Sequence, residues 1–246
     1  MDEIIIRGDQ VELIQREVRK TVNLADFLEV NSKSTGIVIP FLPCNTKGIC
    51  YSSDKATFIV EQEPRIANIN YSISGTVLPF SISLPWLYYG IILELFPKKI
   101  NRVFMTFSKK QVTSRESEVG FLQLPNLRKE TFYGWLCLSG LYVRDALEVH
   151  QCINELTAVI FTSNFSGDYL EHFNEPMASK RTYYSSAERL GKDNSPAAEY
   201  LINANDSKVK YMYTWDQMSP KSDFLDKLVL QDPRTYGDFL KLALGE

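Results

Sequence analysis

One short stretch carries the residue types that could do covalent chemistry. Residues 124–140, LPNLRKETFYGWLCLSG, hold a Pro125-Asn126 pair and, three residues after Gly134, a cysteine at position 137. A thiol attacks as its thiolate, so Cys137 needs a partly exposed site that does not raise its pKa too far. The Asn126 amide can donate to the oxyanion of a tetrahedral intermediate, and one such donor lowers the barrier by about 3 kcal/mol.

A carboxylate also follows this stretch in the chain, at Asp168, which ends the polar segment 162–168. Each of these residues also has a purely structural interpretation. Cys137 could be a small buried hydrophobe, Asn126 a turn residue after proline, and Asp168 part of a Ser-Gly turn. The surrounding elements must decide between the two interpretations.

An amphipathic helix is predicted over residues 9–30, ahead of the strands. Apolar residues recur there at spacings of mostly three and four, and charged residues largely occupy the other positions. Asp9 is a suitable N-cap, and turn-forming residues at 31–36 end the segment.

Short strands are predicted from about residue 36 to 107. The segment 66–73 roughly alternates apolar and polar residues, and prolines fall mostly at the edges of the apolar segments. Consecutive short strands with tight connections predict an antiparallel meander.

Helical periodicity returns after the cysteine, over residues 142–161. Further on, the pattern predicts a helix over 196–205 with proline in its first turn, a strand over 208–215, and short helices over 223–230 and 235–244. No repeat, linker or break in composition marks a second domain, so residues 1–246 are predicted to form one domain.

This order of elements, with the motif in its place, resembles the ubiquitin-conjugating enzyme (UBC-like) fold. That family carries His-Pro-Asn followed by Gly-x-x-Cys-Leu, and its cysteine holds a ubiquitin-like protein as a thioester. Leu124 stands where the family has histidine, and the gap from asparagine to cysteine is a few residues longer than usual. The matching residues here are Pro125, Asn126, Gly134, Cys137 and Leu138.

More narrowly, the chain is similar to divergent prokaryotic UBC-like proteins carried by plasmids and phages. The stretches 61–65 (EQEPR) and 83–87 (SLPWL) support this narrower likeness. The resemblance implies an α+β fold in which an antiparallel β-meander is flanked by the N-terminal helix 9–30 and the post-cysteine helix. The UBC-like core would cover about residues 36–170, with a C-terminal α/β extension over 171–246.

The resemblance implies a cysteine-dependent transferase without cofactor or metal. Cys137 would carry a ubiquitin-like modifier received from an activating enzyme, and Asn126 and Asp168 would assist its transfer to an amine. Because Leu124 replaces the motif histidine, a second hypothesis stays open. In it the fold is catalytically silent and serves as an interaction or assembly module of a mobile element or phage.

Composition and charge limit which partners and which cellular location we expect. The net charge is −3 and the sequence pI about 5.6, which disfavours a nucleic-acid partner. The apolar stretch 82–96 is interrupted by Pro85 and too short to span a bilayer, and the N-terminus lacks the pattern of a signal peptide. We therefore expect a cytoplasmic protein without a membrane partner, whose four cysteines are reduced.

A zinc site is the competing use of the cysteines. The spacing of the candidate ligands is wider than in zinc ribbons, and His-x-Cys on a helix separates its two side chains by about 200°. Structural roles are therefore favoured for these cysteines. His172 is expected to be a solvated histidine without a catalytic role. The aromatic residues 211, 213 and 215 are expected to pack against the core. The candidate zinc ligands are Cys44, Cys50, His150 and Cys152.

Overall fold

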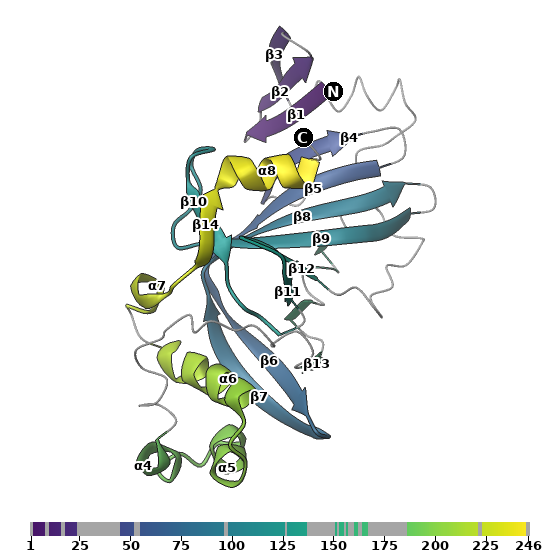
Figure 1. Cartoon of the computed structure of the whole chain (residues 1–246). Helices are drawn as coiled ribbons and strands as arrows, with labels where there is room; N and C mark the ends of the chain where they lie inside the picture. The colour runs from purple at the N-terminus through teal and green to yellow at the C-terminus, as the bar shows by residue number, and fades with distance from the viewer. Residues whose placement is uncertain are drawn as a thin grey trace.

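The computed structural model is a mixed α+β protein whose largest element is a mostly antiparallel sheet (Figure 1). The structure describes residues 2–7, 10–15, 18–23, 45–51, 55–95, 98–125, 127–136, 164–166, 186–220 and 223–244. Within the segment 151–161 it describes residues 151, 153, 154, 156, 160 and 161, and all of them are helical. This agrees with the helix predicted over 142–161, as far as the described residues reach.

Eleven strands of the described part form one sheet. They are β1 (Asp2–Arg7), β2 (Gln10–Gln15), β3 (Val18–Asn23), β4 (Thr46–Tyr51), β5 (Lys55–Gln62), β8 (Trp86–Leu95), β9 (Lys98–Ser108), β10 (Glu118–Phe121), β11 (Leu127–Lys129), β12 (Gly134–Leu136) and β14 (Gln231–Thr235). The main path runs β11-β12-β9-β8-β5-β4-β1-β2-β3, and β10 pairs with both β9 and β14. The predicted meander is confirmed for β4, β5, β8 and β9, which lie side by side.

The helix predicted over residues 9–30 is wrong, because β2 and β3 occupy its first half as an antiparallel hairpin. Residues 11, 14, 18 and 22 fit a helical period, but Val and Ile predominate there and lose side-chain freedom in a helix. The preceding strand β1 offers the alternative, since Ile4, Ile5 and Ile6 pair with residues 13, 12 and 11 of β2. Pairing with a neighbouring strand therefore overrides the local period.

A long hairpin with a bend in its middle connects two sheets. β5 and β8 end their pairing at Gln62 and Leu87, and β6 (Arg65–Ile73) and β7 (Thr76–Leu84) resume it at Arg65 and Leu84. Proline lies on both sides of the gap, at residues 64 and 85, and cannot donate to a ladder. The two family-like stretches, 61–65 and 83–87, thus face each other at this bend.

The second sheet has the order β13-β6-β7, with β13 (Asn164–Ser166) parallel to β6. At the tip of the β6–β7 hairpin, Ser74 and Gly75 both have positive φ, of 49° and 82°. Two such residues make the tight turn whose twist matches that of antiparallel strands. The tip thereby sets the register in which one face of this hairpin is buried.

Helices cover β7 at the lower end of the molecule in Figure 1. The helices α5 (Pro196–Asn203) and α6 (Ser207–Met218) pack on β7, α4 (Ala187–Leu190) packs on α5, and α7 (Phe224–Lys227) follows them. The helix predicted over 196–205 is confirmed by α5, whereas the segment 223–230 holds only the single turn α7. None of the described helices is long and apolar enough to cross a membrane.

The strand predicted over residues 208–215 is wrong, because α6 occupies it. Asp206 caps the helix by accepting from the backbone N–H groups of Lys208 and Val209. The aromatic residues 211 and 215 alternate as in a strand, but they also lie one helical turn apart. The helix end then binds the outer edge of β7, where Asp216 accepts from Ser81 N at 2.6 Å.

The last helix, α8 (Tyr236–Leu244), confirms the helix predicted over 235–244 and lies across the main sheet (Figure 1). Its Phe239 and Ala243 are buried with Tyr88 and Phe104 of the sheet. The strand β14 just before it pairs with β10, so residues of the predicted C-terminal extension are part of the main sheet. The single-domain boundaries and the limits of the core stay predictions.

Gly90 on β8 gives a test of this packing. A Cβ at Gly90 would lie 2.9 Å from the Ala243 Cβ, which cannot rotate away. Overpacking of about 1–3 kcal/mol then exceeds the roughly 0.5–1 kcal/mol that alanine gains over glycine in a strand. We expect Gly90→Ala to lower the free energy of unfolding, measured by urea denaturation. Gly48→Ala is the control, because its Cβ would meet Ile59 at an ordinary 3.7 Å, and an equal loss in both variants would contradict this packing.

Candidate functional site

The three predicted site residues, Asn126, Cys137 and Asp168, lie outside the described residues. The structure describes both flanks of the first two. Leu127 opens β11, directly after Asn126, and Leu136 closes β12, directly before Cys137. The frame of the site can therefore be built from these flanks.

A short hairpin forms that frame. β11 and β12 pair antiparallel, with Leu127 opposite Leu136, and β12 continues into the main sheet by pairing with β9. Gly134, the glycine of the motif, starts β12 where no side chain fits. A Cβ there would lie 2.5 Å from the Leu127 Cγ and 2.7 Å from the Phe121 ring. The motif glycine therefore has a packing reason that is independent of catalysis.

Gln123 fixes the loop that leads to Asn126. Its buried amide Nε2 donates to the backbone oxygens of Leu124, at 3.0 Å, and of Leu127, at 3.1 Å. The Tyr211 hydroxyl of α6 donates to the backbone oxygen of Gln123 at 2.8 Å. Leu124, in the position of the motif histidine, is only 2% exposed. The loop is thus held from one residue before the histidine position, which sequence reasoning missed. A polar residue inside the apolar run 121–124 was the available signal.

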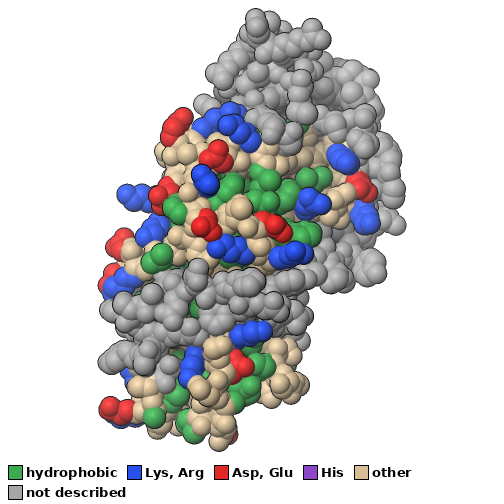
Figure 2. Space-filling view, in the orientation of Figure 1, with side chains coloured by type: hydrophobic (Ala, Val, Ile, Leu, Met, Phe, Trp, Pro, Cys, Tyr) green, Lys and Arg blue, Asp and Glu red, His purple; other side chains and the backbone are tan. Residues whose placement is uncertain are grey.

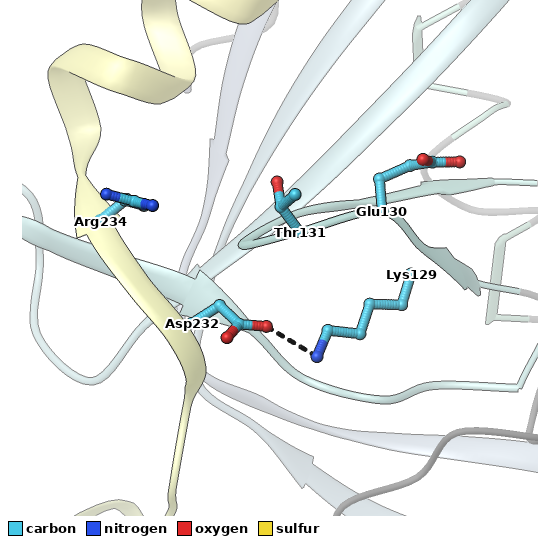
Figure 3. Close-up of a pocket in the computed structure, with 5 residues that line it drawn as sticks. All are labelled: Lys129, Glu130, Thr131, Asp232 and Arg234. Atoms are coloured by element: carbon cyan, nitrogen blue, oxygen red, sulfur yellow. Dashed lines mark ion pairs between the residues drawn. The ribbon is translucent and has the colours of Figure 1, made fainter.

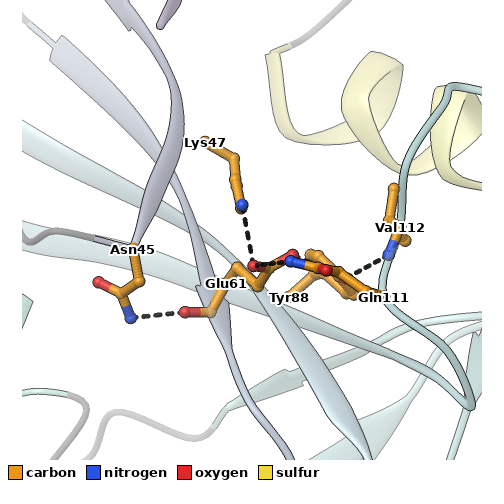
Figure 4. A network of polar contacts seen from close by, with 6 residues as sticks. All are labelled: Asn45, Lys47, Glu61, Tyr88, Gln111 and Val112. Carbon is orange, nitrogen blue, oxygen red and sulfur yellow. Dashed lines mark hydrogen bonds and ion pairs between the residues drawn. The ribbon is translucent and has the colours of Figure 1, made fainter. Parts of the chain in front are cut away.

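A buried polar network lies on the other side of the sheet, beside α8 (Figure 4). Glu61 is 5% exposed, and its carboxylate pairs with the Lys47 ammonium at 2.9 Å. It also accepts from the Gln111 amide at 3.1 Å and the Tyr88 hydroxyl at 3.0 Å. The Tyr88 oxygen in turn accepts from Val112 N at 2.8 Å. The Glu61 carboxylate thus has three donors, and none of them needs to be replaced by a ligand. We interpret the network as structural: it holds the loop after β9 against the sheet.

An open pocket of about 420 Å³ lies between the β11–β12 turn and β14 (Figure 3). The Lys129 ammonium points to Asp232 in this view, and the two form an ion pair of 2.7 Å. Asp232 has a positive φ of 47°, an uncommon conformation for a residue other than glycine. Thr131 and Arg234 complete the lining together with Glu130. The ion pair between Lys129 and Asp232 connects the β11–β12 hairpin to β14. Because the two charges cancel, the pocket offers little net charge to a ligand.

Of the candidate zinc ligands and His172, the structure describes only Cys50. Cys44, His150, Cys152 and His172 lie outside the described residues, and Cys50 is half-buried on β4. The residues that the structure describes hold no cluster of three or more potential metal ligands. The packing role of the aromatic cluster is confirmed, since Tyr211, Tyr213 and Trp215 are all buried.

Comparison with known proteins returned no matching family model, no matching curated protein and no matching solved structure. The resemblance to ubiquitin-conjugating enzymes therefore stays a prediction that rests on the motif and on the strand meander before it, because the strands β2 and β3 occupy much of the expected N-terminal helix.

The role of Gln123 can be tested by Gln123→Met, which keeps the shape and removes the amide. Two buried backbone oxygens then lose their hydrogen-bond donor, so we expect the free energy of unfolding to fall by about 1–3 kcal/mol. Gln217→Met serves as the control, because Gln217 is half-buried and its amide contacts the Asp193 carboxylate at a long 3.4 Å. Urea denaturation measures both variants, and equal stabilities would contradict the anchoring role.

Tyr88→Phe tests the network around Glu61, and its effect on stability should depend on pH. Loss of the hydroxyl leaves Val112 N without its acceptor, so we expect a loss of about 1–3 kcal/mol at neutral pH. Burial first, and then the nearby Glu61 charge, raise the pKa of Tyr88 far above its ordinary value of about 10. The unfolded tyrosine ionises above about pH 10 while the folded one does not, so native stability from this group falls as pH rises.

The stability deficit of Tyr88→Phe should therefore shrink between pH 9 and about pH 11 in urea denaturation experiments. A deficit that stays constant or grows with pH would show that folding does not hold the Tyr88 hydroxyl protonated.

Proposed function

We propose that the protein is a ubiquitin-conjugating-enzyme-like transferase in which Cys137 carries a modifier as a thioester. The Cys137 thiolate attacks the activated C-terminal carboxyl of the modifier, and the activating group leaves. An amine then attacks the thioester carbonyl, and the thiolate leaves in turn. The Asn126 amide stabilises the oxyanion formed when the amine attacks, and Asp168 accepts the proton of the amine.

The end of the β11–β12 ladder is the observation that carries this proposal. Leu127 and Leu136 are Cα partners, and the motif asparagine and cysteine are each one residue beyond them. Two peptide links of about 3.8 Å and a ladder spacing of about 5 Å keep the Cα atoms of residues 126 and 137 within roughly 13 Å. The proposal requires these two residues, eleven positions apart in the chain, to act on one carbonyl, and this upper limit is compatible with it.

Strand alternation adds a direction to this argument. Gly134 and Leu136 face the core, whereas Trp135 between them is half-buried on the opposite face. The proposal requires that the ladder extends by one pair, because period two then assigns residue 137 to the Trp135 face. On that face a thiol can meet a partner protein.

The Gln123 anchor supports the proposal where the sequence departs from the family. The motif histidine is replaced by Leu124, yet the loop before Asn126 is held by two hydrogen bonds from the Gln123 amide. We infer that Gln123 takes over the positioning that the resemblance assigns to the histidine.

One observation favours the second candidate, a silent assembly module. Leu124 and Leu136 are 2% and 6% exposed, so the cysteine follows directly on a buried residue. A thiol enclosed by such neighbours would have a raised pKa and little reactivity. Access to the thiol thus separates the two functions.

Alkylation gives the first test. If Cys137 is the acceptor, iodoacetamide should label it in the native protein at least tenfold faster than the half-buried Cys50, as followed by peptide mass spectrometry. Labelling of Cys137 only after denaturation would favour the assembly module.

Loading gives the second test. The protein is incubated with ATP, an activating enzyme and a candidate ubiquitin-like modifier, then run on gels with and without dithiothreitol. We expect an adduct sensitive to dithiothreitol, absent in Cys137→Ala and kept in Cys50→Ala. Asn126→Ala should still load but discharge to free lysine about 100-fold more slowly. An adduct that survives Cys137→Ala would refute the proposal.

A further inference from the structure

A straight row of residues crosses five strands on one face of the main sheet. Strand pairing puts each member opposite the next, and every second residue of a strand faces the same side. α8 covers one end of the row, where Phe239 and Ala243 lie against Gly90. The opposite end of the row, at β11 and β12, is not covered by α8. In order, the row is Arg128, Trp135, Phe104, Gly90 and Ile59.

Arginines flank the aromatic residues at the uncovered end. The Arg128 guanidinium lies 5.3 Å from the centre of the Trp135 ring, and that of Arg102 lies 5.5 Å from the same ring. Arg102 also lies 5.8 Å from the ring of Phe104, and Tyr133 packs edge-on against Phe104. We call these residues the arginine–tryptophan face: Arg102, Phe104, Arg128, Tyr133 and Trp135.

The face is ordered before any partner arrives. Glu130 accepts from the Trp135 indole N–H at 2.9 Å and approaches the Arg128 Nε at 3.7 Å. Stacking on a ring also restrains an arginine and leaves its edge free to donate. Little side-chain freedom is therefore left to lose on binding.

One positive charge on the face is uncompensated. Glu130 offsets Arg128, whereas Arg102 is exposed and has no carboxylate within ion-pair distance among the residues that the structure describes. Figure 2 shows hydrophobic side chains gathered over the middle of the sheet, with charged side chains of both signs around them. An apolar area beside an unpaired guanidinium is complementary to a carboxylate next to an apolar side chain.

We propose that the arginine–tryptophan face binds an acidic segment of a partner protein. A carboxylate of that segment pairs with Arg102, and a neighbouring apolar side chain packs on Trp135 and Tyr133. Trp, Tyr and Arg are the residue types that dominate binding energy at protein interfaces. This surface is independent of the thioester chemistry and does not require that Cys137 is active.

A nucleic-acid strand fits the same face less well. Binding of its backbone needs a groove with many cations, whereas this face has two arginines and the carboxylate of Glu130. A planar guanidinium held against a ring instead matches a single carboxylate in bidentate geometry.

The test uses the full chain and a fluorescein-labelled peptide of Asp and Glu residues around a central Leu-Phe pair, with affinity measured by anisotropy. We expect Arg102→Gln to weaken binding on the order of tenfold, and Arg102→Lys to restore it only in part because stacking is lost. Lys110→Gln, an exposed site in the loop after β9, removes the same charge and should bind like the parent. A peptide with Asn and Gln in place of Asp and Glu should not bind.

Three results would overturn the proposal. In the first, the acidic peptide does not bind, or Arg102→Gln and Lys110→Gln weaken it equally. In the second, a single-stranded oligothymidine binds more tightly than the peptide and loses affinity in Arg102→Gln, which would assign the face to nucleic acid. In the third, light scattering shows a dimer that Arg102→Gln dissociates, which would assign the face to a second copy of the chain.

Discussion

The interrupted ladder between the strands of the long hairpin is the constraint on which the fold depends. Hydrogen bonding runs along β5 and β8, stops where Pro64 and Pro85 cannot donate, and resumes along β6 and β7. One pair of chain segments thereby becomes the centre of one sheet and most of another. The helices α5 and α6 pack on the second sheet, and α8 packs on the first.

The main sheet separates two environments that matter for function. On one face, Leu127 and Leu136 join a core that also includes residues of α5 and α6. On the other face, α8 covers part of the surface, Phe104 is buried, and Trp135 and Arg128 at the end of the row are half-buried and exposed, respectively. The short strand β12 contributes to both faces, so the same hairpin that leads to the motif residues also presents Trp135 to a partner.

The sequence predicted the antiparallel strands of the centre and several helices because their local signals agree with their surroundings. Proline at 196 and the apolar period at 235–244 match α5 and α8. Prediction failed at residues 9–30 and 208–215, where the apolar spacing fits both a helix and a strand. In the first case pairing with β1 decided, and in the second the Asp206 cap and packing on β7 decided.

The sequence by itself determined the inventory: a motif with one glycine, asparagine and cysteine, strands bounded by prolines, and helices with recognisable starts. Only the tertiary structure decided which distant residues meet. The backbone oxygen of Gln123 accepts from Tyr211 of α6, and Arg102 of β9 reaches Trp135 on the neighbouring strand β12. Such contacts depend on strand register and helix placement, which are set by burial of the whole core and leave no periodic trace in the local sequence.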